Sequence, residues 1–141
     1  MKRGIVGVMV CGFALFVGAC KEETQTEDAL KYSPEEQAMR EKIHRDGRVT
    51  RALEEFLFAI GSYPTTEQGL RGLVEKPKGL SDPAAWQGPY LLDEADLLDT
   101  WGHEFKYSFP GKTHEGKYDI VSFGPDGAEG TGDDYLNWNI R

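Results

Sequence analysis

One apolar face constrains the fold of this chain more than any other feature. Six apolar side chains recur at helical spacing within one short segment: Val49, Ala52, Leu53, Phe56, Leu57 and Ile60. They form the stripe of an amphipathic helix, which has to be buried against another element. The rest of the chain must therefore supply a surface that covers this stripe.

The sequence also marks the two ends of this helix. Ser33, followed by a proline and two glutamates, is typical of an N-terminal cap. Gly61 follows the last apolar position and suits a C-terminal cap. We expect a long N-terminal helix of about 25 residues, with a bend or break at Gly47, because glycine is unfavourable inside a helix.

Two later segments have the alternation of β-strands. Residues 104–109 (EFKYSF) place three aromatic side chains on one face, and residues 117–123 (KYDIVSF) form the partner. The seven residues between them predict an antiparallel hairpin. The expected fold class is α+β, with the long helix packed on a small antiparallel sheet.

The segment between helix and hairpin is less regular. Thr65 and Gln68 are spaced as a capping box for a second, short helix that contains Leu70, Leu73 and Val74. Residues 88–92 predict a short strand or an extended edge, and residues 99–102 (DTWG) predict a turn.

The segment FGPDGAEGTGDDYLNW, residues 123–138, has little apolar surface to bury. Between Gly124 and Asp134 there are four glycines and four acids: Asp126, Glu129, Asp133 and Asp134. Calcium prefers oxygen ligands of this kind, and glycines let backbone carbonyls turn inward. The spacing does not fit an EF-hand. Composition alone leaves an irregular calcium loop and a solvated mobile loop as equal alternatives, and no neighbouring nucleophile favours a catalytic carboxylate pair.

The N-terminus has the layout of a bacterial export signal. Lys2 and Arg3 precede an apolar run that ends in small residues directly before Cys20, which resembles a lipobox. An uncleaved anchor and an ordinary secretory signal are the alternatives. We expect a lipoprotein signal peptide at 1–19, lipid attachment at Cys20, a flexible tether at 20–33 and a globular domain at 34–141.

Charge and cysteine content follow from this division. The chain has 16 Lys and Arg against 24 Asp and Glu, and loss of Lys2 and Arg3 with the signal takes the net charge from −8 to −10. Such acidity disfavours nucleic acid as a partner. Cys11 would leave with the signal and Cys20 would be lipidated, so no disulfide would stabilise the domain and a metal is one candidate replacement.

A family resemblance begins at YPTTEQGLRGLVEKP, residues 63–77. This run resembles the signature of the major pseudopilin of the type II secretion system. The resemblance continues in order through residues 86–91, 99–102, 107–111, 118–119, 122–127 and 137–138. It implies a pilin-like fold with a calcium-binding C-terminal loop.

The same resemblance suggests which residues hold the calcium ion. It implies carboxylate ligands from Asp126 and Asp133, with Asp134 as a further ligand, and carbonyl ligands from Phe123, Ala128 and Tyr135. Trp138 would cover the loop.

The N-terminus departs from the family. Residues 12–15 (GFAL) imitate the start of a prepilin-peptidase site, but Val17 stands where the family has glutamate and the apolar run stops at Ala19. We expect a non-catalytic, lipid-anchored component related to type II secretion in the Gram-negative cell envelope, facing the periplasm, with pseudopilins or other envelope proteins as partners. The alternative is a free-standing periplasmic binding module.

Histidines and aromatic residues suggest two further kinds of site. His44, His103 and His114 lie in different predicted elements without ligand spacing, so surface positions are favoured over a zinc site. The aromatic residues are abundant enough for a carbohydrate platform, but core packing is the favoured interpretation: Trp86, Trp101, Phe105, Tyr107, Phe109 and Tyr118.

Overall fold

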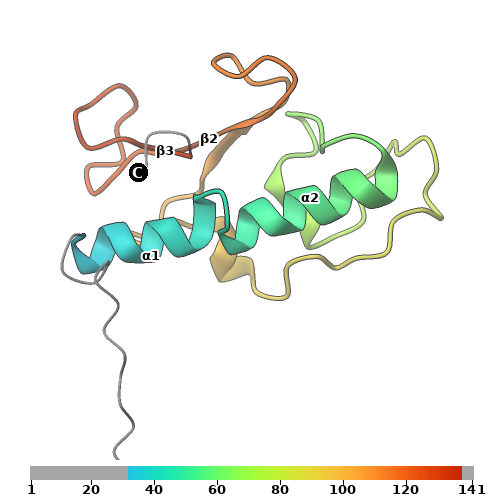
Figure 1. Ribbon diagram of the computed structural model, residues 1–141, viewed down its shortest axis with the longest axis horizontal. Coiled ribbons are helices and arrows are strands. Elements are labelled where there is room, and N and C mark those ends of the chain that lie inside the picture. The colour runs from blue at the N-terminus through green and yellow to red at the C-terminus, as the bar shows by residue number, and fades with distance from the viewer. Residues whose placement is uncertain (1–31, 138–141) are drawn as a thin grey trace, which may run out of the picture.

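The computed structural model describes residues 32–137 and has the expected α+β class (Figure 1). Two helices, α1 (Pro34–Ile43) and α2 (Arg48–Ile60), precede two short 3₁₀ turns, η2 (Leu70–Leu73) and η3 (Glu94–Leu97). Strands β1 (Lys106–Ser108), β2 (Asp119–Ser122) and β3 (Tyr135–Leu136) complete the chain. The predicted signal, Cys20, most of the tether and Trp138 lie outside the described residues.

The N-terminal cap forms as expected, but the helical region is divided. The Ser33 hydroxyl accepts a hydrogen bond from the Glu36 amide at 3.2 Å, and the Glu36 carboxylate accepts one from the Ser33 amide at 2.8 Å. Of the bend or break expected at Gly47, the structure shows a complete break, since α1 ends at Ile43 and α2 begins at Arg48. A Cβ at position 47 would lie 2.5 Å from the Lys42 carbonyl oxygen, so close backbone approach requires glycine here.

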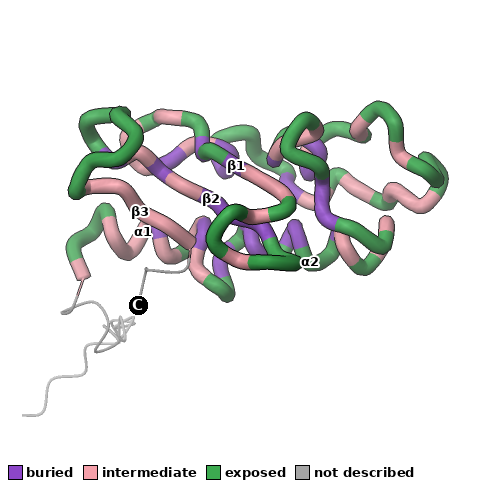
Figure 2. Tube along the Cα trace, turned by 90° about the horizontal axis from the view of Figure 1, so that it is seen from above, coloured by how far each residue is buried: buried purple, intermediate pink, exposed green. Residues whose placement is uncertain are grey.

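The sheet is antiparallel, with strand order β1-β2-β3. Tyr107 pairs with Ile120 in the expected hairpin, although both strands are shorter than the sequence pattern suggested. Strand β3 was not expected, and it pairs Tyr135 with Ser122. The sheet lies across the two helices, with buried residues between the layers (Figure 2).

The core lies between α2 and the sheet and contains the predicted apolar stripe. Phe56, Leu53 and Val49 are fully buried. The Tyr63 and Tyr118 rings meet edge to face, with 4.8 Å between their centroids. Burial in this core raises the pKa of the Tyr118 hydroxyl to about 12. The aromatic residues considered for a carbohydrate platform belong to this core or pack against its edge: Trp86, Trp101, Phe105, Tyr107, Phe109 and Tyr118.

The segment between α2 and β1 agrees in part with the sequence prediction. The capping box forms, since the Thr65 amide donates to the Gln68 side chain at 2.9 Å and the Gln68 amide donates to the Thr65 hydroxyl at 3.2 Å. The expected short helix follows as the 3₁₀ helix η2, which contains Leu70 and Leu73 and has Val74 as its C-terminal cap. Residues 88–92 are not a strand, because the Tyr90 and Leu91 amides both donate to the Leu73 carbonyl.

None of the helices within residues 32–137 has the length and apolar character needed to cross a bilayer.

Two phenylalanines on α2 allow a matched test of this packing. Phe56 is fully buried, whereas Phe58 is 94% exposed. We expect Phe56→Ala to lower the free energy of unfolding by about 3–5 kcal/mol because it opens a cavity. Phe58→Ala should change it by less than about 0.5 kcal/mol. Urea unfolding followed by circular dichroism measures both, and equal losses would contradict the assigned face of α2.

Candidate functional site

The acidic loop, residues 123–134, connects β2 to β3 and folds back on itself. Ser122 pairs with Tyr135 at its base, so the two limbs of the loop start side by side. Gly124, Gly127 and Gly130 have positive φ angles of 65°, 65° and 90°, which glycine adopts without strain. A Cβ at position 124 would lie 2.5 Å from the Asp133 carbonyl oxygen, so this glycine also permits close contact between the limbs.

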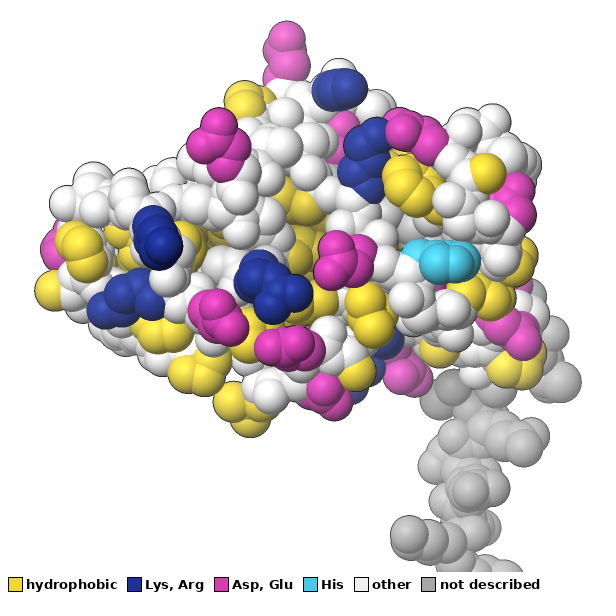
Figure 3. Space-filling model, turned by 180° about the vertical axis from the view of Figure 1, so that it is seen from behind, with side chains coloured by type: hydrophobic (Ala, Val, Ile, Leu, Met, Phe, Trp, Pro, Cys, Tyr) yellow, Lys and Arg dark blue, Asp and Glu magenta, His cyan; other side chains and the backbone are white. Residues whose placement is uncertain are grey.

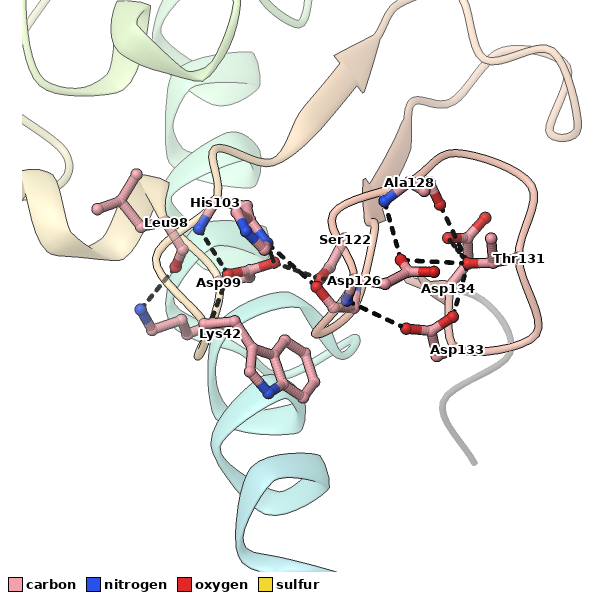
Figure 4. A network of polar contacts seen from close by, with 12 residues as sticks. Lys42, Leu98, Asp99, His103, Ser122, Asp126, Ala128, Thr131, Asp133 and Asp134 are labelled. Carbon is pink, nitrogen blue, oxygen red and sulfur yellow. Dashed lines mark hydrogen bonds and ion pairs between the residues drawn. The ribbon is translucent and has the colours of Figure 1, made fainter.

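Four acceptor oxygens of the loop converge on the hydroxyl of Thr131 (Figure 4). The hydroxyl oxygen lies 2.6 Å from Asp133 Oδ1, 3.0 Å from the Ala128 carbonyl oxygen, 3.4 Å from Asp126 Oδ1 and 3.5 Å from Asp134 Oδ1. A hydroxyl has one hydrogen, so it can fully satisfy only one of these acceptors. Three carboxylates are thus gathered around one neutral donor.

Backbone amides of the loop orient the carboxylates. The Ala128 amide donates to Asp126 Oδ1 at 2.9 Å, and the Gly130 amide donates to Asp134 Oδ2 at 2.8 Å. The hydrogen bond from Thr131 is the main cause that lowers the pKa of Asp133 below its ordinary value. The hydrogen bond therefore favours the charged form of Asp133.

Glu129 pairs with Lys106 of β1 and not with the Thr131 hydroxyl that the three aspartates approach. Its carboxylate accepts a hydrogen bond from the Lys106 ammonium on β1, and this bond is the main cause that lowers the pKa of Glu129. The same ammonium lies 5.6 Å from the centre of the Phe123 ring. Glu129 therefore ties the loop to the sheet instead of joining the three aspartates.

A buried polar network links the loop to the helices through Asp99, whose side chain is fully buried. Asp99 Oδ1 accepts hydrogen bonds from the Trp101 and His103 amides, and Oδ2 accepts one from the Ser122 hydroxyl at 2.7 Å. On the other side, the Lys42 ammonium of α1 donates to the Leu98 carbonyl at 2.7 Å. Figure 4 shows this path from α1 to the acidic loop.

Comparison with known proteins gives a family for this fold and loop. The family model described as Type II secretion system (T2SS), protein G, matches residues 24–138. The chain belongs to this family.

Relatives and a solved structure agree with the assignment. The type II secretion system core protein G of Aeromonas hydrophila is 41% identical over 91 residues, covering 64% of this chain and 61% of the relative. That of Klebsiella pneumoniae is 37% identical over 109 residues, covering 74% of each chain. The crystal structure of the major pseudopilin from the type 2 secretion system of enterohaemorrhagic Escherichia coli has 32% identity and a TM-score of 0.61, covering 79% of this chain and 93% of that one.

These comparisons confirm the pilin-like fold and the resemblance to the major pseudopilin family. The chain spans about half to three fifths of the length of the first curated relatives that it matches.

The acidic loop contains the kinds of oxygen ligand that a calcium site uses. Carboxylate, carbonyl and hydroxyl oxygens are the hard ligands that calcium takes. Asp126, Asp133, Asp134 and the Ala128 carbonyl all approach Thr131, while the backbones of Phe123 and Tyr135 flank the base of the loop. Over residues 32–137, no three His, Cys, Asp or Glu side chains are arranged so that they could hold a metal ion by themselves. Any cation site in this loop would therefore also need backbone or hydroxyl oxygens.

The histidines have separate surroundings. His103 Nδ1 lies 3.1 Å from the Gly124 carbonyl oxygen, and His114 Nδ1 lies 3.6 Å from Asp119 Oδ1. His44 is the C-terminal cap of α1. Within the described part of the chain they do not meet at a common point that could hold zinc.

The sequence interpretation missed Thr131 and the role of Asp99. Threonine between glycines gave no signal of its own, although its place between Asp126 and Asp133 could have suggested a further oxygen. Asp99 was seen only as part of a turn, because its burial depends on Ser122, 23 residues away.

The crowding of three carboxylates leads to a test in the absence of metal. Asp134→Asn removes one charge but keeps an oxygen that can accept the Gly130 amide. We expect the melting temperature in chelator to rise by about 1–4 °C, since like-charge repulsion at an exposed site is modest.

Differential scanning fluorimetry measures this shift. Glu115→Gln, on the loop between β1 and β2, is the matched control and should leave the melting temperature unchanged. A fall in melting temperature for Asp134→Asn would show that the third carboxylate stabilises the metal-free loop.

Proposed function

We propose that this protein is a non-catalytic structural subunit related to the type II secretion pseudopilins. A calcium ion in the acidic loop would stabilise it, and a lipid on Cys20 would anchor it in the Gram-negative cell envelope, facing the periplasm. The observation that carries the proposal is the match of the protein G family to residues 24–138, which includes the whole acidic loop.

The proposed calcium ligands come from both limbs of the loop. They are the carboxylates of Asp126, Asp133 and Asp134 and the carbonyl oxygens of Phe123, Ala128 and Tyr135. The convergence on Thr131 of the three carboxylates and the Ala128 carbonyl supports these four ligands and adds the Thr131 hydroxyl to the set. The carbonyls of Phe123 and Tyr135 are included because of the family resemblance. When bound, calcium would neutralise part of the carboxylate charge and join the two limbs.

The hollows on the surface of the described residues lie away from the acidic loop. One hollow of about 390 Å³ lies beside Arg71 and Lys76, and another of about 470 Å³ lies beside Phe58 and Tyr90. Neither is lined by histidine or by residues of the acidic loop. Basic and acidic side chains are interspersed on the face seen in Figure 3, which does not suit a nucleic-acid partner. Other pseudopilins are the proposed partners.

The proposed anchor rests on the sequence before the described domain. Cys20 follows small residues at the end of an apolar run. The run is shorter than the ~20 residues that span a bilayer, so a lipid would supply the attachment.

Calcium should raise the stability of the protein. At one hundred times its dissociation constant it would add about 2.7 kcal/mol, or roughly 10 °C in melting temperature. Asp126→Asn should abolish the shift, because it removes a ligand charge while keeping the Ala128 turn. Scanning fluorimetry in chelator and in millimolar calcium measures both.

Glu129→Gln is the control for this experiment. It removes an equal charge from the same loop, but Glu129 pairs with Lys106 and should not be needed for the calcium shift. An unchanged melting temperature of the wild type on adding calcium would refute the metal proposal.

The anchor and the partners can be tested together in a host with an active type II secretion system. Metabolic labelling with palmitate should label the wild type but not Cys20→Ser. In-cell crosslinking should join the wild type to another pseudopilin. An unlabelled wild type would refute the anchor, and a labelled protein without pseudopilin crosslinks would favour the free-standing binding module.

A further inference from the structure

The buried side chain of Asp99 acts on one peptide unit of the acidic loop through Ser122. The Ser122 hydroxyl donates to Asp99 Oδ2 at 2.7 Å and accepts a hydrogen bond from the Gly124 amide at 3.2 Å. Because a hydroxyl has a single hydrogen, donation to Asp99 turns a lone pair of Ser122 toward Gly124. Both Ser122 and the Asp99 side chain are fully buried, so water does not compete for these bonds.

The carbonyl oxygen of Gly124 also contacts a residue of this network. His103 Nδ1 lies 3.1 Å from the Gly124 carbonyl oxygen, and the His103 amide donates to Asp99 Oδ1 at 2.8 Å. Both the N–H and the C=O of Gly124 are therefore tied to residues organised by Asp99. Gly124 lies two residues before Asp126 in the chain.

The planarity of the peptide bond gives this arrangement a consequence for the loop. The Phe123 carbonyl and the Gly124 N–H belong to one planar trans unit and point in opposite directions. A hydrogen bond that fixes the Gly124 N–H therefore also fixes the direction of the Phe123 carbonyl. In the proposed function, that carbonyl is a calcium ligand.

We propose that Asp99 is a positioning residue for the calcium loop: through Ser122 it orients the Phe123–Gly124 peptide and so aims the Phe123 carbonyl at the cation. The inference rests on the proposed calcium site. Groups that orient metal ligands typically change metal affinity by about 10- to 100-fold when they are removed.

Two substitutions test this role from both ends of the contact. Ser122→Ala removes the acceptor of the Gly124 amide. Asp99→Asn is nearly isosteric, but it replaces one carboxylate oxygen by an NH₂ group, which donates and cannot accept. The variant can therefore no longer accept hydrogen bonds from both the backbone amides and the Ser122 hydroxyl. Ser108→Ala and Asp93→Asn are matched controls: they make the same chemical changes on β1 and at the cap of η3, where Asp93 accepts from the Ala95 amide.

The first measurement needs no metal. In chelator, hydrogen exchange of the Gly124 amide, followed by NMR, should become at least about tenfold faster in Ser122→Ala and Asp99→Asn than in the wild type and controls. Unchanged exchange in both variants would overturn the proposal.

The second measurement is calcium titration by calorimetry. We expect both variants to bind about 10- to 100-fold more weakly while retaining the wild-type circular dichroism spectrum. Reduced stability with unchanged calcium affinity would show that Asp99 has only a structural role. If the wild type itself binds no calcium, the proposed metal site fails and with it the aiming of a ligand, while the exchange experiment still decides whether Asp99 orders the Gly124 peptide.

Discussion

The apolar face of α2 lies beneath a sheet whose strands contain only three, four and two residues. Strands this short are not stable alone and need packing against a helix. Phe56 and Leu53 supply that surface, and the rings of Tyr107 and Tyr118 cover it from the sheet side. The central hairpin is therefore held by burial of apolar area, and β3 adds Tyr135, whose ring packs against the core and stacks on Trp101 at 5.6 Å.

The order of β3 depends on the loop that precedes it. That loop is held by hydrogen bonds to Thr131, by the Lys106–Glu129 pair and by the buried contacts of Asp99. A single hydrogen bond contributes only about 1 kcal/mol net, and repulsion among three aspartates opposes closure. A cation among these oxygens would offset that repulsion, so we expect calcium to stabilise the loop and the strand that follows it.

The sequence predicted those features that arise from local patterns. The apolar stripe of α2, the Ser33 cap and the hairpin each depend on residues close together in the chain, and all three are present. A bend or break was expected at Gly47, but the sequence could not choose between them, because the break involves a close approach to the Lys42 carbonyl.

Features that depend on distant partners were not predicted. Strand β3 has two residues and no alternation of its own, so only its pairing with β2 defines it. Asp99 looked like a turn residue because its partner Ser122 is far away in sequence. Thr131 gave no pattern until the folded loop brought three carboxylates around its hydroxyl.

A crystal structure of the full protein grown in millimolar calcium would test the central claim most directly. We expect one ion in the acidic loop, with oxygens of Asp126 and Asp133 and the carbonyl oxygens of Phe123 and Ala128 at about 2.3–2.6 Å from it. Electron density that instead leaves the Thr131 hydroxyl bonded to Asp133, with no ion among the loop oxygens, would contradict it.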